Sequence, residues 1–187
     1  MQQPLRTALH RCEIKHSRFI AVVAPYQDFD AMLVQLQGEH ARASHHCRAA
    51  RWIDLDGRIN ELAHDDGEPS GSAARPMLRV LQSGDWINVG AVVVRYFGGT
   101  KLGTGGLARA YAGAVQSALE SMPASQWVAI RDAKISVKFA SIDALERAVR
   151  AFDLTVISRE FTATGVCLEL RGQSAHIDEL RAKHEAY

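Results

Sequence analysis

The chain has 187 residues, a length typical of one large domain or two small ones. Hydrophobic residues make up 47% and charged residues 23%, as in ordinary globular proteins, and 22 basic against 21 acidic side chains give a net charge of +1. This balance excludes a globally basic nucleic-acid binder, although it leaves room for a local basic patch.

Nothing in the sequence indicates a membrane segment or a disulfide framework. No apolar run approaches the ~20 residues that a transmembrane helix requires, and no apolar stretch follows residues 1–6 to act as a signal peptide. The three cysteines are few, odd in number and far apart, as free thiols in a reducing compartment would be. We therefore expect a cytoplasmic protein that does not contact a membrane.

Hydrophobic periodicity predicts a mixture of strands and helices in the first part of the chain. In chain order, we expect a strand over 19–24, a helix over 28–38, extended segments over 45–54 and 58–62, a polar loop over 64–76, a helix over 76–82 and a buried central strand over 86–97. Asp28 is the expected N-cap of the first helix and Gly38 its expected stop. Another helix follows the glycine-rich segment 98–106, and Pro123 ends it.

The pattern starts again after Pro123. In chain order, we expect a strand over 128–139, a helix opened by Ser141 or Asp143, a hairpin over 154–161 and 165–170, and a helix from Ser174 onward. This βαββα order predicts a small α+β domain with an antiparallel sheet. A split βαβ domain needs one more strand, which the chain either lacks, receives from a partner or has lost. The predicted domains are therefore 1–123 and 124–187.

The glycine-rich segment 98–106 separates the buried strand from the helix after it. It contains five glycines, and the order strand–glycines–helix brings backbone N–H groups and the positive end of a helix dipole together. With the cations nearby, the segment is a candidate phosphate-binding site for a nucleic acid. Its residues are Arg95, Gly98, Gly99, Lys101, Gly103, Thr104, Gly105, Gly106 and Arg109.

Neither common nucleotide-binding motif is met in full. Thr104 and Gly105 stand where a P-loop requires Lys and Ser or Thr. Residues 103–108 fit the dinucleotide pattern G-x-G-x-x-G/A, but five residues separate them from the strand and no βαβ unit follows. We therefore weigh anion binding evenly against a structural role, in which the glycines form a tight turn and let the helix pack on the sheet.

A second cluster combines histidine, cysteine, serine and carboxylates. Its members are His45, His46, Cys47, Asp65, Asp66, Glu68, Ser70 and Ser72. A thiol beside a base could be a nucleophile, and imidazoles with carboxylates could bind a metal. However, strand alternation places His45 and Cys47 on one face and His46 on the other, and no metal-binding spacing such as H-E-x-x-H occurs in the sequence.

A structural role for this cluster is the favoured interpretation. Cys47 is expected to be a small core residue, and the Asp and Ser side chains of 65–73 are expected to cap backbone N–H groups in a turn. We therefore assign no catalytic residue, metal or cofactor, and keep the cluster as a candidate functional loop. The alternative is an enzyme with Cys47 as nucleophile, His45 or His64 as base and an adjacent Asp to orient the base.

Four segments together resemble the signature of the YigZ/IMPACT family. They are RYFGGTKLGTGGL at 95–107, DDGEPSGSA at 65–73, His45-His46-Cys47, and residues 17–20. These matches follow the family's order across roughly the first two-thirds of the chain, and the rest matches only as a βαβ-type pattern. Arg75 departs from the family's pattern, in which a small residue is expected.

The resemblance implies an α+β fold of two domains. The first would be a ribosomal-protein-like β-α-β domain. The second would be a ferredoxin-like α/β-plait domain, and its C-terminal end would be incomplete unless a further strand is supplied. Both domain types occur in proteins that work on the ribosome, so the analogy favours contact with RNA. No catalytic activity is established for the family.

We therefore expect a protein that binds RNA or ribosomal components and influences translation, with phosphate held at the glycine-rich segment. Two alternatives stay open: an enzyme acting on a small substrate through Cys47, and a module without catalysis that binds a protein partner. The question of catalysis is left open and leans toward none. The oligomeric state is not predicted.

Overall fold

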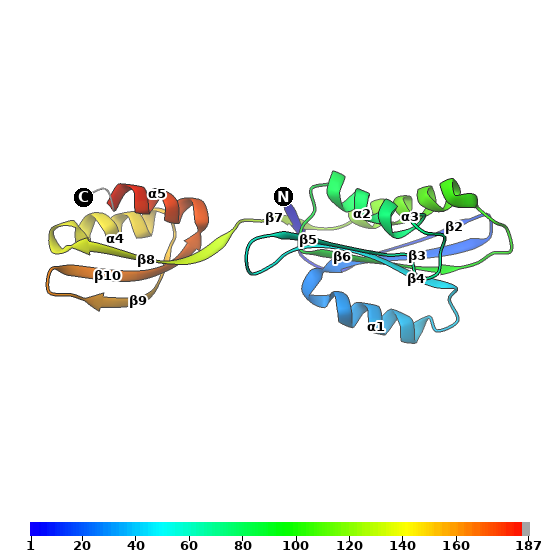
Figure 1. Cartoon of the computed structure of the whole chain (residues 1–187), viewed down its shortest axis with the longest axis horizontal. Helices are drawn as coiled ribbons and strands as arrows, with labels where there is room; N and C mark the ends of the chain where they lie inside the picture. The colour runs from blue at the N-terminus through cyan, green and yellow to red at the C-terminus, as the bar shows by residue number, and fades with distance from the viewer. Residues whose placement is uncertain (185–187) are drawn as a thin grey trace. The chain divides into compact units, whose positions relative to one another are not determined.

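The computed structural model describes residues 1–184, which form two compact units. The first comprises Met1–Trp127 and the second begins at Val128. Each unit has its own antiparallel strands and its own helices, which confirms the predicted two-domain α+β class (Figure 1). The segment after Pro123 forms β7 (Ala124–Gln126), which pairs with β1 (Gln2–Pro4) of the first unit.

A five-stranded sheet with the order β2-β3-β6-β4-β5 organises the first unit. Its strands are β2 (Ala8–Ile14), β3 (Ser17–Pro25), β4 (His45–Ile53), β5 (Ile59–His64) and β6 (Val89–Tyr96). All neighbouring strands are antiparallel, so the parallel βαβ unit of a dinucleotide-binding fold is absent from this sheet. β6 is the central strand, and its residues are buried up to Arg95, as its run of Val and Ala predicts.

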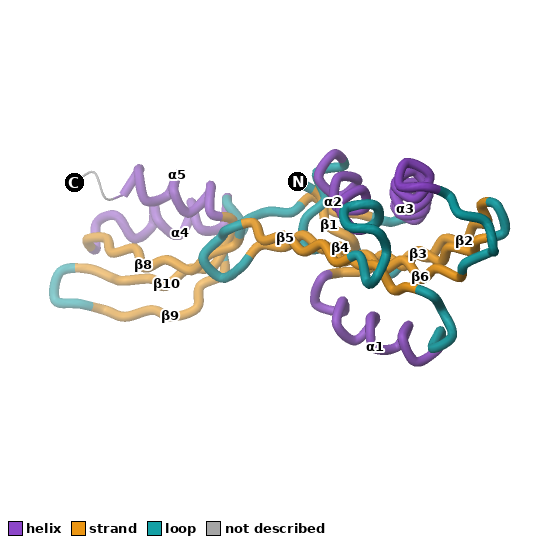
Figure 2. Tube along the Cα trace, turned by 45° about the vertical axis from the view of Figure 1, so that its right-hand side comes forward, coloured by secondary structure: helices purple, strands orange, loops and turns teal. Residues whose placement is uncertain are grey.

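Helices cover both faces of this sheet (Figures 1 and 2). On one face α1 (Phe29–Glu39) packs Phe29, Met32 and Leu36 against apolar side chains of β3, β4 and β6. On the other face lie α2 (Ala74–Ser83) and α3 (Gly103–Glu120). The buried stripe of α3 consists of alanines and aliphatic side chains at helical spacing, together with the larger Tyr111.

The predicted ends of α1 are corrected by the structure. Asp28 precedes the helix but makes no capping hydrogen bond, because the short 3₁₀ turn η1 (Tyr26–Asp28) leads directly into α1 and gives Asp28 helical dihedral angles. Gly38 does not stop the helix, which continues to Glu39. Strand β2 was not predicted from the sequence. Its apolar and polar residues do not follow the two faces of the strand, because Leu9 is exposed and His10 points inward.

The second unit has the order βαββα that the sequence predicts. Its elements are β8 (Ile130–Lys138), the 3₁₀ turn η2 (Phe139–Ser141), α4 (Ile142–Ala151), β9 (Thr155–Phe161), β10 (Gly165–Gln173) and α5 (Ser174–His184). The sheet order is β8-β10-β9, and both helices lie on one face of it (Figure 1). Within residues 1–184, β8 pairs with β10 alone, so its other edge is the position that a fourth strand would occupy.

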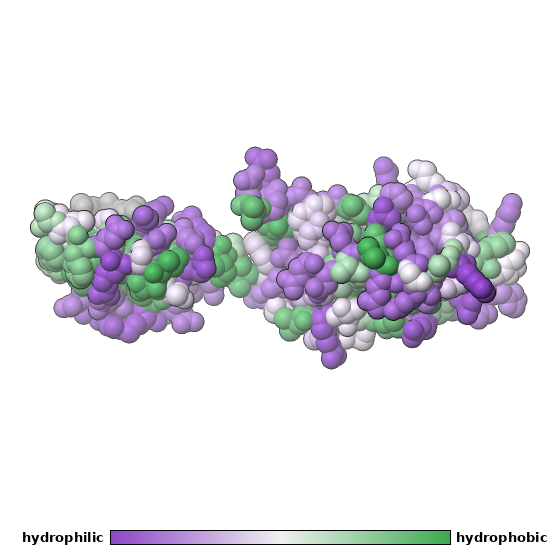
Figure 3. Space-filling model, turned by 90° about the horizontal axis from the view of Figure 1, so that it is seen from below, coloured by the Kyte–Doolittle hydropathy of each residue, from purple (hydrophilic) through white to green (hydrophobic). Residues whose placement is uncertain are grey.

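Within residues 128–184, no helix covers the other face of this second sheet. Charged side chains on it pair across strands, as in the two hydrogen bonds from Arg171 to Asp132. Exposed apolar side chains, including Ile130 and Phe161, belong to the outer strands β8 and β9. Figure 3, seen from below Figure 1, shows hydrophobic and hydrophilic residues intermixed on this unit. Among residues 1–184, no helix is both long enough and apolar enough to cross a membrane.

We predict that Gly98→Ala destabilises the first unit by about 1–3 kcal/mol. A Cβ at Gly98 would lie 2.0 Å from the carbonyl carbon of His16, which is backbone and cannot turn aside. Gly113→Ala is the matched control, since a Cβ there meets nothing within 4 Å and the residue lies inside α3. That change should stabilise the unit by about 0.5–1 kcal/mol.

Denaturant unfolding followed by tryptophan fluorescence measures both changes. Trp52, Trp86 and Trp127 all lie in the first unit, so the signal reports on that unit. Equal midpoints for Gly98→Ala and the wild type would show that the segment near His16 is not packed as described.

Candidate functional site

The two signature segments meet at one end of the central sheet. β4 and β6 pair so that His45 lies opposite Arg95, and the loop 65–73 crosses the same end. α3 passes over this place on the face to which Cys47 also points. Glu68 of the loop lies at the centre of the group.

Glu68 is a buried carboxylate with three polar neighbours. Its side chain is 3% exposed. Its Oε1 accepts hydrogen bonds from Arg95 Nη1 at 2.6 Å and from the Tyr111 hydroxyl at 2.7 Å. His45 Nε2 lies 3.8 Å from the same oxygen. A buried carboxylate is tolerated only when it is paired and hydrogen-bonded in this way.

Arg95, which the sequence places at the phosphate site, is already paired with Glu68. Its side chain is 5% exposed, and its Nη2 donates to Ser17 Oγ at 3.3 Å. The same hydroxyl accepts the Gly98 N–H at 3.1 Å, which ties the glycine-rich segment to β3. Arg95 Nε is buried and has no hydrogen-bond partner among the described residues.

Asp65 and Asp66 hold the loop together, as the structural interpretation predicts. Asp65 accepts hydrogen bonds from three backbone N–H groups, those of Gly71, Ala73 and Ala74, where α2 begins. Burial alone would raise the pKa of Asp65, but these donors outweigh it and hold the pKa below its usual value. Asp66 Oδ2 accepts the N–H of His46 at 2.7 Å, so the loop is fastened to β4.

The three remaining polar members of the cluster do not reach Glu68. Ser72 is buried and donates to the Pro69 carbonyl, whereas Ser70 is exposed on the loop. His46 points to the opposite face from Cys47, and its buried Nε2 has no partner within the described residues. Across residues 1–184, no group of three or more His, Cys, Asp and Glu side chains is arranged to hold a metal ion.

Cys47 lacks the features of a catalytic nucleophile. It is fully buried, and its thiol donates to the Asp65 carbonyl at 2.9 Å. Burial, together with the nearby carboxylates, raises the pKa of the Cys47 thiol to about 12. A hydrogen bond with Tyr111 lowers the pKa, but by less than burial raises it. A reactive cysteine requires the opposite, an accessible thiol with a lowered pKa.

A cavity of about 320 Å³ opens beside the Glu68 cluster. It is lined by Glu68, Pro69, Arg95, Phe97, Lys101, Leu102, Gly103, Thr104 and Leu107. Phe97 is 50% exposed and Lys101 is exposed. α3 begins at Gly103 without a side-chain cap, and Gly103 and Thr104 line the cavity, so the positive end of the helix dipole lies beside it.

The residues of the predicted phosphate site do not all lie at one place in the structure. Lys101, Gly103 and Thr104 line the cavity, whereas Gly106 and Arg109 line a separate depression of about 240 Å³. The remaining three glycines of the segment do not line either hollow. Gly98 packs against the β2–β3 turn, Gly99 has φ +84°, and Gly105 belongs to the helix. The residues at the cavity stay candidates for anion binding, whereas Gly98 has the structural role that was weighed against it.

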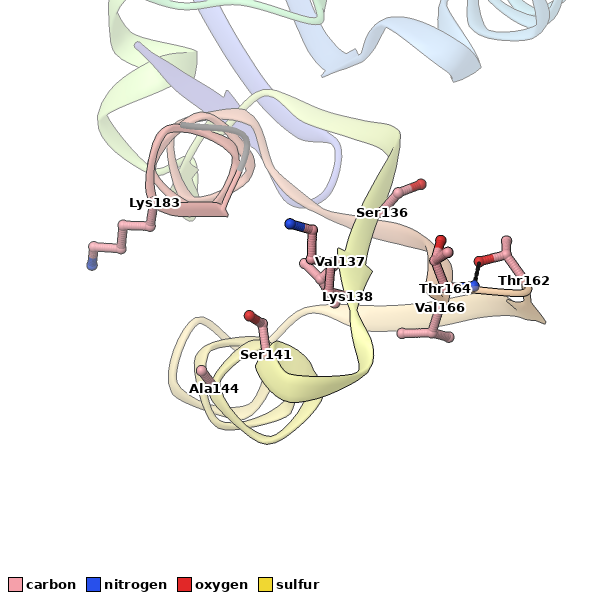
Figure 4. Close-up of a pocket in the computed structure, with 9 residues that line it drawn as sticks. All are labelled: Ser136, Val137, Lys138, Ser141, Ala144, Thr162, Thr164, Val166 and Lys183. Carbon is pink, nitrogen blue, oxygen red and sulfur yellow. Dashed lines mark hydrogen bonds between the residues drawn. The ribbon is translucent and has the colours of Figure 1, made fainter. Parts of the chain in front are cut away.

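The second unit has a cavity of about 370 Å³ at the end of β8 (Figure 4). It is lined by residues of β8, α4, α5 and the β9–β10 hairpin, and its two cations, Lys138 and Lys183, are exposed. Lys183 is already paired with Glu179 at 2.7 Å. Because no buried charged side chain lines this cavity, the cavity of the first unit is the better candidate site.

Tyr111, Phe97 and Ser17 were not identified as site residues from their chemistry. Tyr111 lies on the buried stripe of α3, and a buried tyrosine hydroxyl needs a hydrogen-bond partner. That requirement was the available signal. Nothing local to the sequence shows that Phe97 is exposed at a cavity or that Ser17 meets Arg95.

Comparisons with known proteins agree on one family. The model of the Impact N-terminal domain matches residues 15–119. The IMPACT family member YigZ of Escherichia coli is 34% identical over 176 residues, covering 91% of this chain and 85% of that protein. An IMPACT family member of Haemophilus influenzae is 35% identical over 158 residues, covering 81% and 75%.

One solved structure resembles nearly the whole chain. It is the crystal structure of a hypothetical protein that is 31% identical to this chain. The match has a TM-score of 0.66 and covers 97% of this chain and 89% of that protein. A looser likeness is to the two-domain translational regulator Yih1, with a TM-score of 0.34 and 26% identity over 63% and 46%. At that score the likeness carries no weight for fold or function.

We predict that Tyr111→Phe lowers the stability of the first unit by about 1–3 kcal/mol, because it leaves Glu68 with one donor fewer in a buried place. Tyr26→Phe is the matched control, since the Tyr26 ring stacks on Trp52 and no hydrogen bond of its hydroxyl occurs among the described residues. Its effect should stay within about 0.5 kcal/mol. Equal losses in urea unfolding of the two variants would contradict the described cluster.

Stability should also fall as the pH rises above about 9. Burial raises the pKa of both Cys47 and Tyr111 in the folded state, so the unfolded chain loses these protons first. The unfolded state then binds fewer protons, and the free energy of unfolding decreases by up to about 1.4 kcal/mol per pH unit for each group. Unfolding midpoints between pH 8 and 11 measure this slope, and Cys47→Ala should reduce it. A flat profile would contradict the burial of both groups.

Proposed function

The chain belongs to the IMPACT family, and from this premise we propose that it binds RNA or ribosomal components and influences translation through an anion site at the start of α3. One observation carries the proposal: the exposed Lys101 and the uncapped N-terminus of α3 lie at the same cavity. Free backbone N–H groups at a helix N-terminus are a common phosphate-binding element. RNA supplies a phosphate with every nucleotide.

The charges at the cavity support an anionic ligand. Glu68 and Arg95 neutralise each other in the wall, so Lys101 leaves an excess positive charge at the opening. The helix dipole adds to it. A chain with a net charge of +1 needs such a local site to bind a polyanion.

Two other functions fit the residues less well. Catalysis by Cys47 would require an accessible thiolate, which its burial and raised pKa oppose. Binding of a protein partner is supported by the edge of β8 that pairs with no strand of residues 1–184 and could accept an added strand. Sedimentation with and without ribonuclease separates this from RNA binding, because complexes with RNA should be lost after digestion and protein complexes should persist.

We predict that Lys101→Glu weakens binding of a short single-stranded RNA by about tenfold and lowers the salt slope of the affinity by about one. Arg58→Glu is the matched control, with the same charge change on an exposed residue of the β4–β5 turn, where no side-chain hydrogen bond of Arg58 occurs among residues 1–184. Its affinity should change less than about twofold, because the turn lies at the other end of β4. Fluorescence anisotropy at several salt concentrations measures both, and equal losses for the two variants would place the RNA elsewhere.

A further inference from the structure

Only one of the two carboxylate oxygens of Glu68 accepts hydrogen bonds from the described residues. Oε1 receives Arg95 and Tyr111 and lies near His45. No described residue donates a hydrogen bond to Oε2. Unlike Arg95 Nε, which is buried and has no partner among residues 1–184, Oε2 is not fully buried. Glu68 lines the cavity, so a ligand held there can reach its carboxylate.

An acceptor of this kind can take a hydrogen bond from water, or from a ligand that displaces the water. The Glu68 side chain is 97% buried, and leaving one of its oxygens without a partner costs free energy unless something in the cavity donates to it. Since Arg95 already balances the charge of Glu68, a neutral hydroxyl suits Oε2 better than an ammonium group or a metal ion does. The ligand at this wall should therefore carry a hydroxyl.

The opening of the cavity requires a different group. Lys101 and the N-terminus of α3 favour an anion, and the excess of one positive charge matches the single charge of a phosphodiester. The Phe97 ring, half exposed at the same cavity, has the Arg95 guanidinium 5.6 Å from its centroid. An exposed aromatic ring in such a position can stack against a nucleobase of any sequence.

We propose that this cavity holds one ribonucleotide of a single-stranded RNA, with its ribose 2′-hydroxyl donating to Glu68 Oε2. The phosphate lies at Lys101 and Gly103, and the base stacks on Phe97. The 2′-hydroxyl is the group that distinguishes RNA from DNA at a protein site. A cavity of about 320 Å³ is large enough for one nucleotide and excludes a duplex. This inference rests on the proposed RNA-binding function and adds the basis on which RNA is selected.

Three oligonucleotides of one sequence test the proposal on the wild-type protein by fluorescence anisotropy: RNA, DNA and 2′-O-methyl RNA. RNA should bind at least about tenfold more tightly than the other two, because DNA lacks the hydroxyl and the methyl ether has no hydrogen to donate. Equal affinities for all three, together with a loss of affinity in Lys101→Glu, would overturn the role of Glu68 and leave the phosphate site intact. Failure of all three to bind would overturn the proposed function as well.

Two variants locate the discrimination. Glu68→Gln presents an amide that donates to a hydroxyl or to an ether oxygen, so the preference for RNA over 2′-O-methyl RNA should fall at least fivefold. Phe97→Ala removes an exposed ring and should weaken all three oligonucleotides to a similar extent, with their ratios unchanged. If Glu68→Gln folds and keeps the wild-type preference, or if it fails to fold and the wild type shows no preference, the proposal is wrong.

A free ribonucleoside monophosphate tests whether the ligand is a strand. The RNA strand should bind more tightly, because flanking phosphates add contacts with the positive charge at the opening. A monophosphate that binds as tightly as the RNA and displaces it would overturn the assignment to RNA in favour of a free nucleotide.

Discussion

The buried ion pair between Glu68 and Arg95 is the interaction on which the rest of the first unit's site depends. Two charged groups have been removed from water, and they are tolerated because each is also hydrogen-bonded, Glu68 by Tyr111 and Arg95 by Ser17. Removal of either charged member of the pair would leave the other charge buried without compensation. The pair therefore joins the loop 65–73, β3, β6 and α3 into one arrangement.

This constraint explains why the surrounding backbone is so closely specified. The loop must turn back at Asp66 and Gly67, both with positive φ, to bring Glu68 beneath α3, and Asp65 fixes that turn by binding the first N–H groups of α2. The Ser17 hydroxyl that receives Arg95 also binds the Gly98 N–H. The glycine-rich segment is thereby held close to β3, and the cavity opens where that segment turns into α3.

Local pattern predicted the elements better than it predicted the site. β6 is a continuous apolar run and α3 has a helical periodicity, and the structure confirms both elements. β2 was missed because this edge strand has Leu9 on its exposed face and His10 on its inward face, which breaks the alternation of apolar and polar residues. The pairing of Glu68 with Arg95 and Tyr111 joins residues 27 and 43 positions apart, and no periodicity specifies contacts over such distances. Arg95 was assigned to phosphate from its place beside the glycines, and its pairing with a carboxylate 27 positions earlier could not be read from local pattern.

The most direct test of the account is photo-crosslinking of the wild-type protein to a short single-stranded RNA, with mass spectrometry to locate the crosslinked residues. The account predicts crosslinks within the segment 95–109, with Phe97 and Lys101 foremost, because the base and phosphate are placed there. Crosslinks confined to the second unit, residues 128–184, would contradict it and move RNA binding away from the cavity beside Glu68.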